Sequence, residues 1–151
     1  MNLKNFNMKQ KIILASTSPR RHELAKTMGL DFEIMPSSFE EDMTLKLSPE
    51  KLVQELAYGK AYDIAKKLND GLVIGVDTIV VNKNKVLGKP KSEKEAFEML
   101  KSYSGKAHIV LSGIAIIDAK TKKSIKAFEK TKVYFKKLTD KEINSYIETR
   151  E

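Results

Sequence analysis

The sequence of 151 residues predicts an α/β fold, a mixed twisted sheet with flanking helices. Strand-like apolar runs alternate with segments in which apolar residues recur every three or four positions. A serine or threonine stands before each of those helical segments, as helix caps do. Two long strand-like runs, 107–117 and 125–135, are joined by only a short stretch. Parallel neighbours need a long crossover, so these two runs are expected to pair antiparallel and to make the sheet mixed.

The first predicted elements are a buried strand at 12–15 and a helix at 19–28. Ser18 takes the N-cap position, and the proline after it suits the first helical position. Gly29 is expected to end the helix as a C-cap. A short strand at 31–35 follows.

The middle of the chain predicts a helix and then a central strand. Ser48 caps a helix at 49–68, and Gly71 belongs to the turn that ends it. The run 72–81 is mostly apolar and β-branched, which is typical of a strand buried on both faces. Asp77 is the single residue that interrupts this run.

The last elements are a short returning strand at 85–87, a helix at 93–103 behind Ser92, the two long strands, and a final helix. Thr139 precedes that last helix and Glu142 follows three residues later, which is the spacing of a capping box. The helix is expected to run to the end of the chain. A single domain over residues 1–151 is expected.

Composition narrows the classes of function. There is no cysteine, which excludes disulfides and thiolate metal sites. The two histidines are too few for a histidine-based zinc site without carboxylate ligands. No apolar run approaches membrane-spanning length and no signal peptide is seen, so a cytoplasmic protein without a membrane partner is expected. The formal net charge of +8 favours an anionic partner. The lysines are scattered, so a nucleic-acid platform is not favoured over general lysine enrichment.

The segment IILASTSPRRHEL, residues 12–24, predicts a phosphate cradle. A strand, a hydroxyl-rich loop that includes Ser16 and a helix N-terminus follow one another, and N-terminal N–H groups attract anions. Arg20 and Arg21, two of the three arginines in the chain, add cations shaped for phosphate oxygens. The alternative is an ordinary strand–helix turn with two solvated arginines.

Asp77 is the clearest candidate for chemistry, because burying a carboxylate is unfavourable unless it is paired, hydrogen-bonded or metal-bound. The alternative is a bulge or edge aspartate that faces water. Glu41, in the acidic cluster 40–42, is a possible second carboxylate for Mg²⁺, although such loops are commonly just solvated. Lys60 and Lys89 are further phosphate candidates, against the simpler case of exposed lysines. His108 can either donate hydrogen bonds to a ligand or be a histidine of the core.

Taken together, the segments LASTSPRRHEL, GVDTIV, VLGKP, LKSYSGKAHIVLSGIAI and the final YIETRE resemble the Maf family of nucleoside triphosphate pyrophosphatases, also called septum formation inhibitors. The resemblance is collinear from about Lys11 to the last residue. It implies hydrolysis of a nucleoside triphosphate to a monophosphate and pyrophosphate. It also implies a fold like that of the inosine triphosphatases, with two lobes and a central cleft, and often a homodimer.

The resemblance also implies roles for particular residues. Asp77 matches the proton acceptor, and a Mg²⁺ or Mn²⁺ ion is expected at Glu41 and Asp77. Arg20 and Thr78 match positions linked to substrate choice. The other polar positions that match the family cleft are Ser16, Arg21, Glu41, Lys60 and Lys89. The pairing of SPRR with DT resembles the branch acting on dTTP and UTP, including modified forms such as pseudo-UTP, rather than the branch acting on 7-methyl-GTP.

The chain departs from the family in one respect. Family members continue beyond the position of Glu151 through a motif like P-x-D-K-A-G-A-Y-G-I-Q-G, whose glutamine is a specificity position. The domain is therefore expected to be C-terminally incomplete, with an exposed strand edge and an open cleft. Two alternatives stay open. In one, the chain is a catalytically impaired remnant that still binds nucleotide, and in the other it is a basic nucleic-acid-binding or regulatory module.

Overall fold

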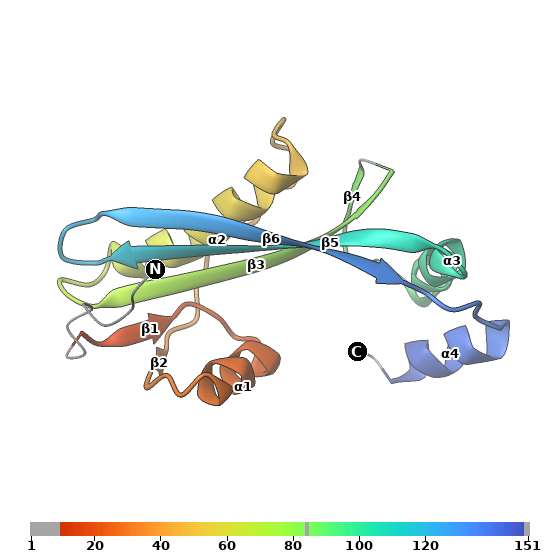
Figure 1. The fold of residues 1–151 in the computed structure, drawn as a ribbon, viewed down its shortest axis with the longest axis horizontal. Helices are drawn as coiled ribbons and strands as arrows, with labels where there is room; N and C mark the ends of the chain where they lie inside the picture. The colour runs from red at the N-terminus through yellow and green to blue at the C-terminus, as the bar shows by residue number, and fades with distance from the viewer. Residues whose placement is uncertain (1–9, 84, 150–151) are drawn as a thin grey trace. The chain divides into compact units, whose positions relative to one another are not determined.

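The computed structural model describes residues 10–83 and 85–149 (Figure 1). Strands and helices alternate along the chain as the sequence predicts. Their bounds are β1 Ile12–Leu14, α1 Pro19–Thr27, β2 Glu33–Ile34, α2 Pro49–Ala65, β3 Leu72–Asn82, β4 Lys85–Leu87, α3 Glu93–Tyr103, β5 Ala107–Asp118, β6 Ser124–Tyr134 and α4 Asp140–Glu148. Among the described residues, no helix combines the length and the apolar character needed to cross a membrane.

The strands form one mixed sheet in the order β2-β1-β3-β5-β6, and β4 pairs with β3. β1 is parallel to both β2 and β3, whereas β4 is antiparallel to β3. β5 and β6 are neighbours joined by a tight turn, in which the Asp118 N–H donates to the Lys123 carbonyl over 2.9 Å. A connection this short allows only an antiparallel pair, so the predicted α/β fold with a mixed sheet is confirmed.

The chain divides into two compact units. The first holds residues up to Asp77 together with 112–128. Here α2 packs against the sheet so closely that a Cβ atom added to Gly75 would lie 2.1 Å from the Ala57 carbonyl oxygen. Gly113 of β5 meets the Val53 carbonyl in the same way, at 2.3 Å. Small residues therefore set the distance between helix and sheet.

α2 ends at Ala65, three residues before the predicted Leu68. Lys122 of the β5–β6 turn reaches the end of the helix. Its ammonium group donates to the carbonyls of Ala65, at 2.8 Å, and Leu68, at 3.1 Å. A lysine that is distant in sequence thus satisfies carbonyls that further helical turns would otherwise cover.

The second unit holds 78–111 and 129–151, and its core contains three rings in contact, of which one pair is stacked and the other two pairs are tilted. His108 is 8% exposed, and its ring lies 4.9 Å from that of Tyr103 and 5.0 Å from that of Phe135. Burial lowers the pKa of His108 below its ordinary value. Of the two interpretations left open by the sequence, the structure supports a core histidine.

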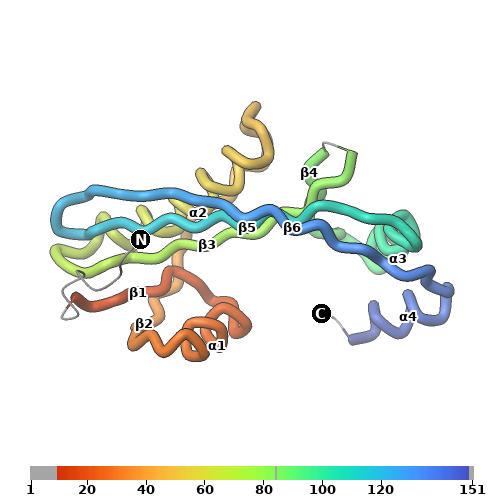
Figure 2. Tube along the Cα trace, in the orientation of Figure 1, coloured from red at the N-terminus to blue at the C-terminus, as the bar shows by residue number. Residues whose placement is uncertain are grey.

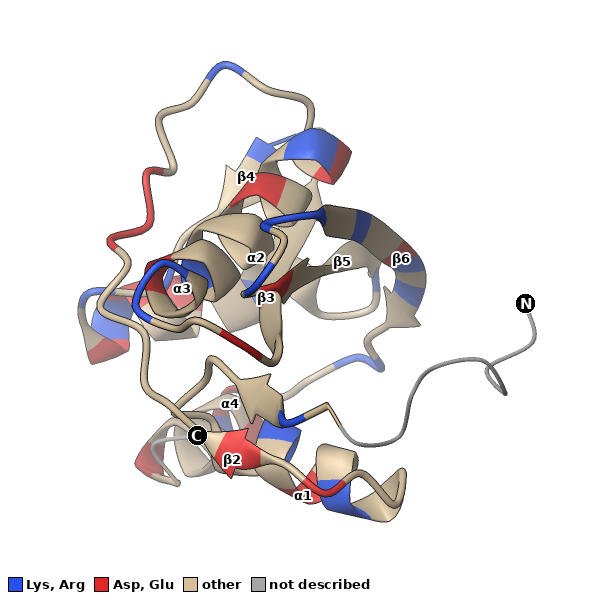
Figure 3. Cartoon of the chain, turned by 90° about the vertical axis from the view of Figure 1, so that its left-hand side faces the viewer, with Lys and Arg blue, Asp and Glu red and all other residues tan. Residues whose placement is uncertain are grey.

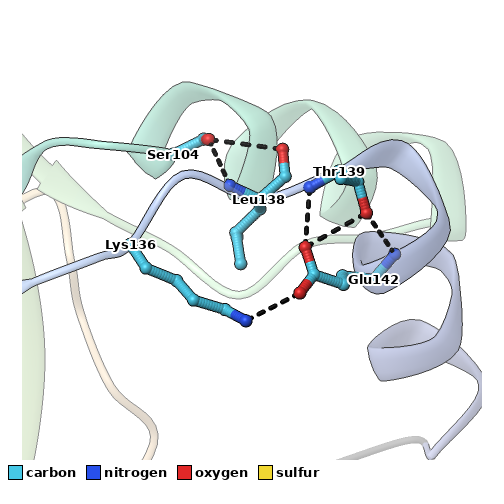
Figure 4. A network of polar contacts seen from close by, with 5 residues as sticks. All are labelled: Ser104, Lys136, Leu138, Thr139 and Glu142. Atoms are coloured by element: carbon cyan, nitrogen blue, oxygen red, sulfur yellow. Dashed lines mark hydrogen bonds and ion pairs between the residues drawn. The ribbon is translucent and has the colours of Figure 1, made fainter.

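α4 begins with the predicted capping box (Figure 4). The Glu142 N–H donates to the Thr139 hydroxyl over 3.2 Å, and the Thr139 N–H donates to the Glu142 carboxylate over 2.8 Å. The Lys136 ammonium and the Thr139 donors lower the pKa of Glu142 to about 2. Ser104 ties this turn to the end of α3, because its hydroxyl accepts from the Leu138 N–H over 2.8 Å.

Lysine and arginine residues occur on helices, strands and connections alike (Figure 3). Along β6 they include Lys126, Lys130 and Lys132. Lys126 has an acidic partner in α2, the Glu55 carboxylate, at 2.6 Å.

Candidate functional site

The loop between β1 and α1 is held by its own polar groups. Ser16 is buried, and its hydroxyl accepts a hydrogen bond of 3.1 Å from the Ser18 N–H. The Ser16 carbonyl lies 2.8 Å from Nε2 of His22, one turn into the helix. Ser18 occupies the predicted N-cap position, but its side chain makes no capping hydrogen bond. The predicted strand–loop–helix arrangement is present, with Ser16 rather than Ser18 organising the turn.

The two adjacent arginines have different environments. Arg21 is half-buried, and its guanidinium donates to the Val76 carbonyl over 2.8 Å. This bond brings the first turn of α1 to the residue just before Asp77 on β3. Arg20 is exposed. Only Arg21 therefore adds a fixed positive charge at the buried end of this segment.

Asp77 is 4% exposed and forms an ion pair with the Lys60 ammonium from α2. The same ammonium lies 2.8 Å from a Glu41 carboxylate oxygen, so one lysine holds two carboxylates. Burial raises the pKa of Asp77 above its ordinary value, and the Glu41 charge adds to that shift. The Lys60 ammonium and the Arg21 guanidinium oppose it. The result is a buried carboxylate that is more basic than an ordinary aspartate.

The close packing of α2 on β3 places Lys60 at Asp77. Side chains alternate along a strand, so Gly75 and Asp77 face the same side of the sheet. Ala57 and Ala61 of α2 contact the place where Gly75 lacks a side chain. Lys60 belongs to the same turn of the helix as Ala61, and it reaches Asp77 from there.

The carboxylates of Glu41 and Asp77 also suit a divalent cation. Both bind one positively charged group, and Mg²⁺ is commonly held by one or two carboxylates with phosphate oxygens and water as the other ligands. Within residues 10–83 and 85–149 no group of three or more His, Cys, Asp or Glu side chains could hold a metal by itself. The donor set therefore fits a cation shared with a phosphate, not a cation enclosed by protein.

The first unit thus contains six of the predicted site residues, and three of these meet directly, namely Glu41, Lys60 and Asp77. Thr78 and Lys89 are exposed residues of the second unit, and their roles stay predictions. Sequence reasoning missed His22 and Asp63. His22 follows the two arginines directly, so a signal was present. Asp63 has Gly59, Lys60, Lys66 and Lys67 as its neighbours on the helix face, so no apolar surroundings marked it in the sequence.

Comparisons with known proteins show the family and the fold of the chain. The model of the family described as Maf-like protein matches residues 11–151. A dTTP/UTP pyrophosphatase of Alkaliphilus oremlandii is 54% identical over 145 residues, which span 95% of this chain and 74% of that protein. One from Thermoanaerobacter sp. is 51% identical over 142 residues, covering 93% and 74% of the two chains. The Staphylococcus aureus Ham1 protein superposes with a TM-score of 0.58 at 17% identity, covering 87% of this chain and 73% of that one, which is a likeness of fold.

Proposed function

Because the chain belongs to the Maf-like protein family, we propose that it hydrolyses dTTP and UTP, with modified forms such as pseudo-UTP, to the monophosphate and pyrophosphate. The names of the relatives support the substrate class. The observation that carries the proposal is the buried Asp77 paired with Lys60. A basic carboxylate beside a fixed cation is what attack of water on a phosphate requires.

In the proposed reaction, water attacks the α phosphorus and the bond to the oxygen bridging to the β phosphorus breaks. That oxygen leaves with the electron pair as part of pyrophosphate. Asp77 accepts the proton of the attacking water, and its raised pKa makes it a better base than an ordinary aspartate. Lys60 and Arg21 supply positive charge for the phosphate oxygens.

Other residues keep their predicted tasks in this proposal. Arg20 and Thr78 select the nucleotide, and Ser16 and Lys89 contribute to binding of the triphosphate. A Mg²⁺ or Mn²⁺ ion held by Glu41 and Asp77 would neutralise charge on the phosphate oxygens when bound.

Asp77→Asn tests the proposal, because the amide keeps the shape of the side chain but accepts no proton. Pyrophosphate release from dTTP and UTP, measured with and without Mg²⁺, is expected to fall by about 10²-fold or more. The fold should persist, since the amide keeps the volume of the side chain and Lys60 retains its ion pair with Glu41. Asp70→Asn changes an exposed acid of the same unit and should leave turnover as in the wild type.

Unchanged turnover in Asp77→Asn refutes the role of Asp77. If the wild-type chain releases no pyrophosphate but is stabilised by a non-hydrolysable dTTP analogue, it is a nucleotide-binding remnant. A salt-sensitive shift of DNA or RNA without turnover would instead identify a basic nucleic-acid-binding module.

A further inference from the structure

Asp63 is a buried carboxylate to which the proposed reaction gives no task. It lies on α2, one turn after Lys60, and is 7% exposed. One of its oxygens accepts three hydrogen bonds from the chain after β2: from the Ser38 N–H at 2.9 Å, and from the hydroxyls of Ser37 and Ser38 at 3.1 Å each. Its other oxygen lies 3.1 Å from the Lys66 ammonium and 3.3 Å from that of Lys67.

These partners keep Asp63 ionised. The Ser38 N–H, the two lysines and the Ser37 hydroxyl hold the pKa of Asp63 well below its usual range. A negative charge near the C-terminal end of a helix is unfavourable with respect to the helix dipole. The position of the Asp63 charge is therefore explained by its contacts with the connection between β2 and α2 (residues 35–48, orange to yellow in Figure 2).

A second contact fixes the same connection to the same face of α2. A Cβ atom added to Gly59 would lie 2.2 Å from Cζ of Phe39, so the Phe39 ring fills the place of the missing side chain. Gly59 and Asp63 are four residues apart and therefore neighbours on the helix surface. The Phe39 N–H also donates to the Ser37 hydroxyl over 3.1 Å, which links the two contacts.

Glu41 follows Phe39 by two residues and pairs with Lys60, which lies between the two contacts in sequence. We define residues 36–42 as the acidic loop. Its residues after Phe39 are exposed, so little burial holds them in place. The position of the Glu41 carboxylate therefore depends on how Ser37, Ser38 and Phe39 are attached to α2.

We propose that Asp63 is a positioning residue, which binds Ser37 and Ser38 and thereby holds the Glu41 carboxylate at the Lys60–Asp77 pair. Its effect on turnover rests on the proposed function, whereas its effect on the acidic loop does not. Misplacement of a functional group by 1 Å lowers a rate by up to about 10²-fold. Replacement of Asp63 is thus expected to reduce activity, although Asp63 itself does not contact the substrate.

The first measurement is amide hydrogen exchange in the free protein. Asp63→Ala removes the acceptor of the Ser38 N–H, and exchange at Ser38 and Phe39 should accelerate at least about tenfold. Asp63→Asn retains one acceptor oxygen and should give a smaller acceleration; it carries the test if Asp63→Ala does not fold. Unchanged exchange at both amides in the folded variants overturns the proposal.

The second measurement is kcat/KM for dTTP in a double-mutant cycle with Glu41→Gln. Asp63→Ala should lower kcat/KM about tenfold or more in the wild-type background and less than about twofold when Glu41 is already changed. Equal losses in both backgrounds indicate a merely structural role and overturn the proposal. So does wild-type kcat/KM in Asp63→Ala.

Asp118→Ala is the matched control. Asp118 also binds the backbone of a connection in the first unit, accepting from the N–H groups of Lys120 at 2.8 Å and Thr121 at 3.1 Å. Its loss should accelerate exchange in the β5–β6 turn and leave both the acidic loop and kcat/KM unchanged. If the wild-type chain has no turnover, the proposed function fails, and the exchange measurement still decides whether Asp63 holds the loop.

Discussion

Gly75→Ala should damage both the stability and the activity of this protein through a single methyl group. The added Cβ would lie 2.1 Å from the Ala57 carbonyl oxygen and 2.7 Å from the Ala61 nitrogen. Non-bonded heavy atoms pack best at about 3.5 Å or more, so the overlap exceeds about 1 Å. Both contacts are backbone atoms of α2, and no side-chain rotation can relieve them. The helix has to move away from β3.

The size of the effect follows from that displacement. Overpacking a core typically costs about 1–3 kcal/mol, and a backbone clash on a central helix belongs at the upper end. At this chain length about 3 kcal/mol corresponds to a fall in Tm of about 6–12 °C. The same shift of about 1 Å separates Lys60 from Asp77, for which a loss of about 10²-fold in kcat/KM is expected.

Thermal unfolding and pyrophosphate release from dTTP measure the two effects. Gly88→Ala is the control for stability, because no described atom lies within 4 Å of a Cβ built at Gly88. Its Tm should not fall below that of the wild type. Wild-type Tm and turnover in Gly75→Ala would refute the argument that glycine contact sets the helix position.

Two further predictions concern the second unit. Burial lowers the pKa of His108, so the unfolded chain binds its proton more readily, and stability is lost as the pH falls below about 6.5. His108→Phe should therefore flatten the pH dependence of the urea midpoint between pH 7.5 and 5.5. Equal slopes of midpoint against pH in the variant and the wild type would contradict this. Thr139→Ala removes the capping hydroxyl of α4 and should cost about 1 kcal/mol, or about 2–4 °C in Tm, whereas Thr139→Ser should retain the wild-type Tm. An unchanged Tm in Thr139→Ala would show that the capping box adds no stability.

Local signals in the sequence determined most of the elements, because caps and strand periodicity act within a few residues. The capping box of Thr139 and Glu142 and the bounds of α3 follow directly from such signals. Asp77 was identified in the same way, as one charge in an apolar run. The family also followed from the sequence, because its motifs are local and collinear.

Long-range contacts decided the rest. The sequence around Arg20 and Arg21 does not distinguish the two arginines. In the structure only Arg21 of the two donates a hydrogen bond to the Val76 carbonyl on β3. Lys122 reaches the carbonyl of Ala65 at the end of α2, and Ser38 and Phe39 contact Asp63 and Gly59 of the same helix. Each of these contacts joins residues that are distant in sequence, so no local pattern records it. The sequence by itself identified the candidate groups for chemistry, whereas the packing of α2 on the sheet decided which of them meet.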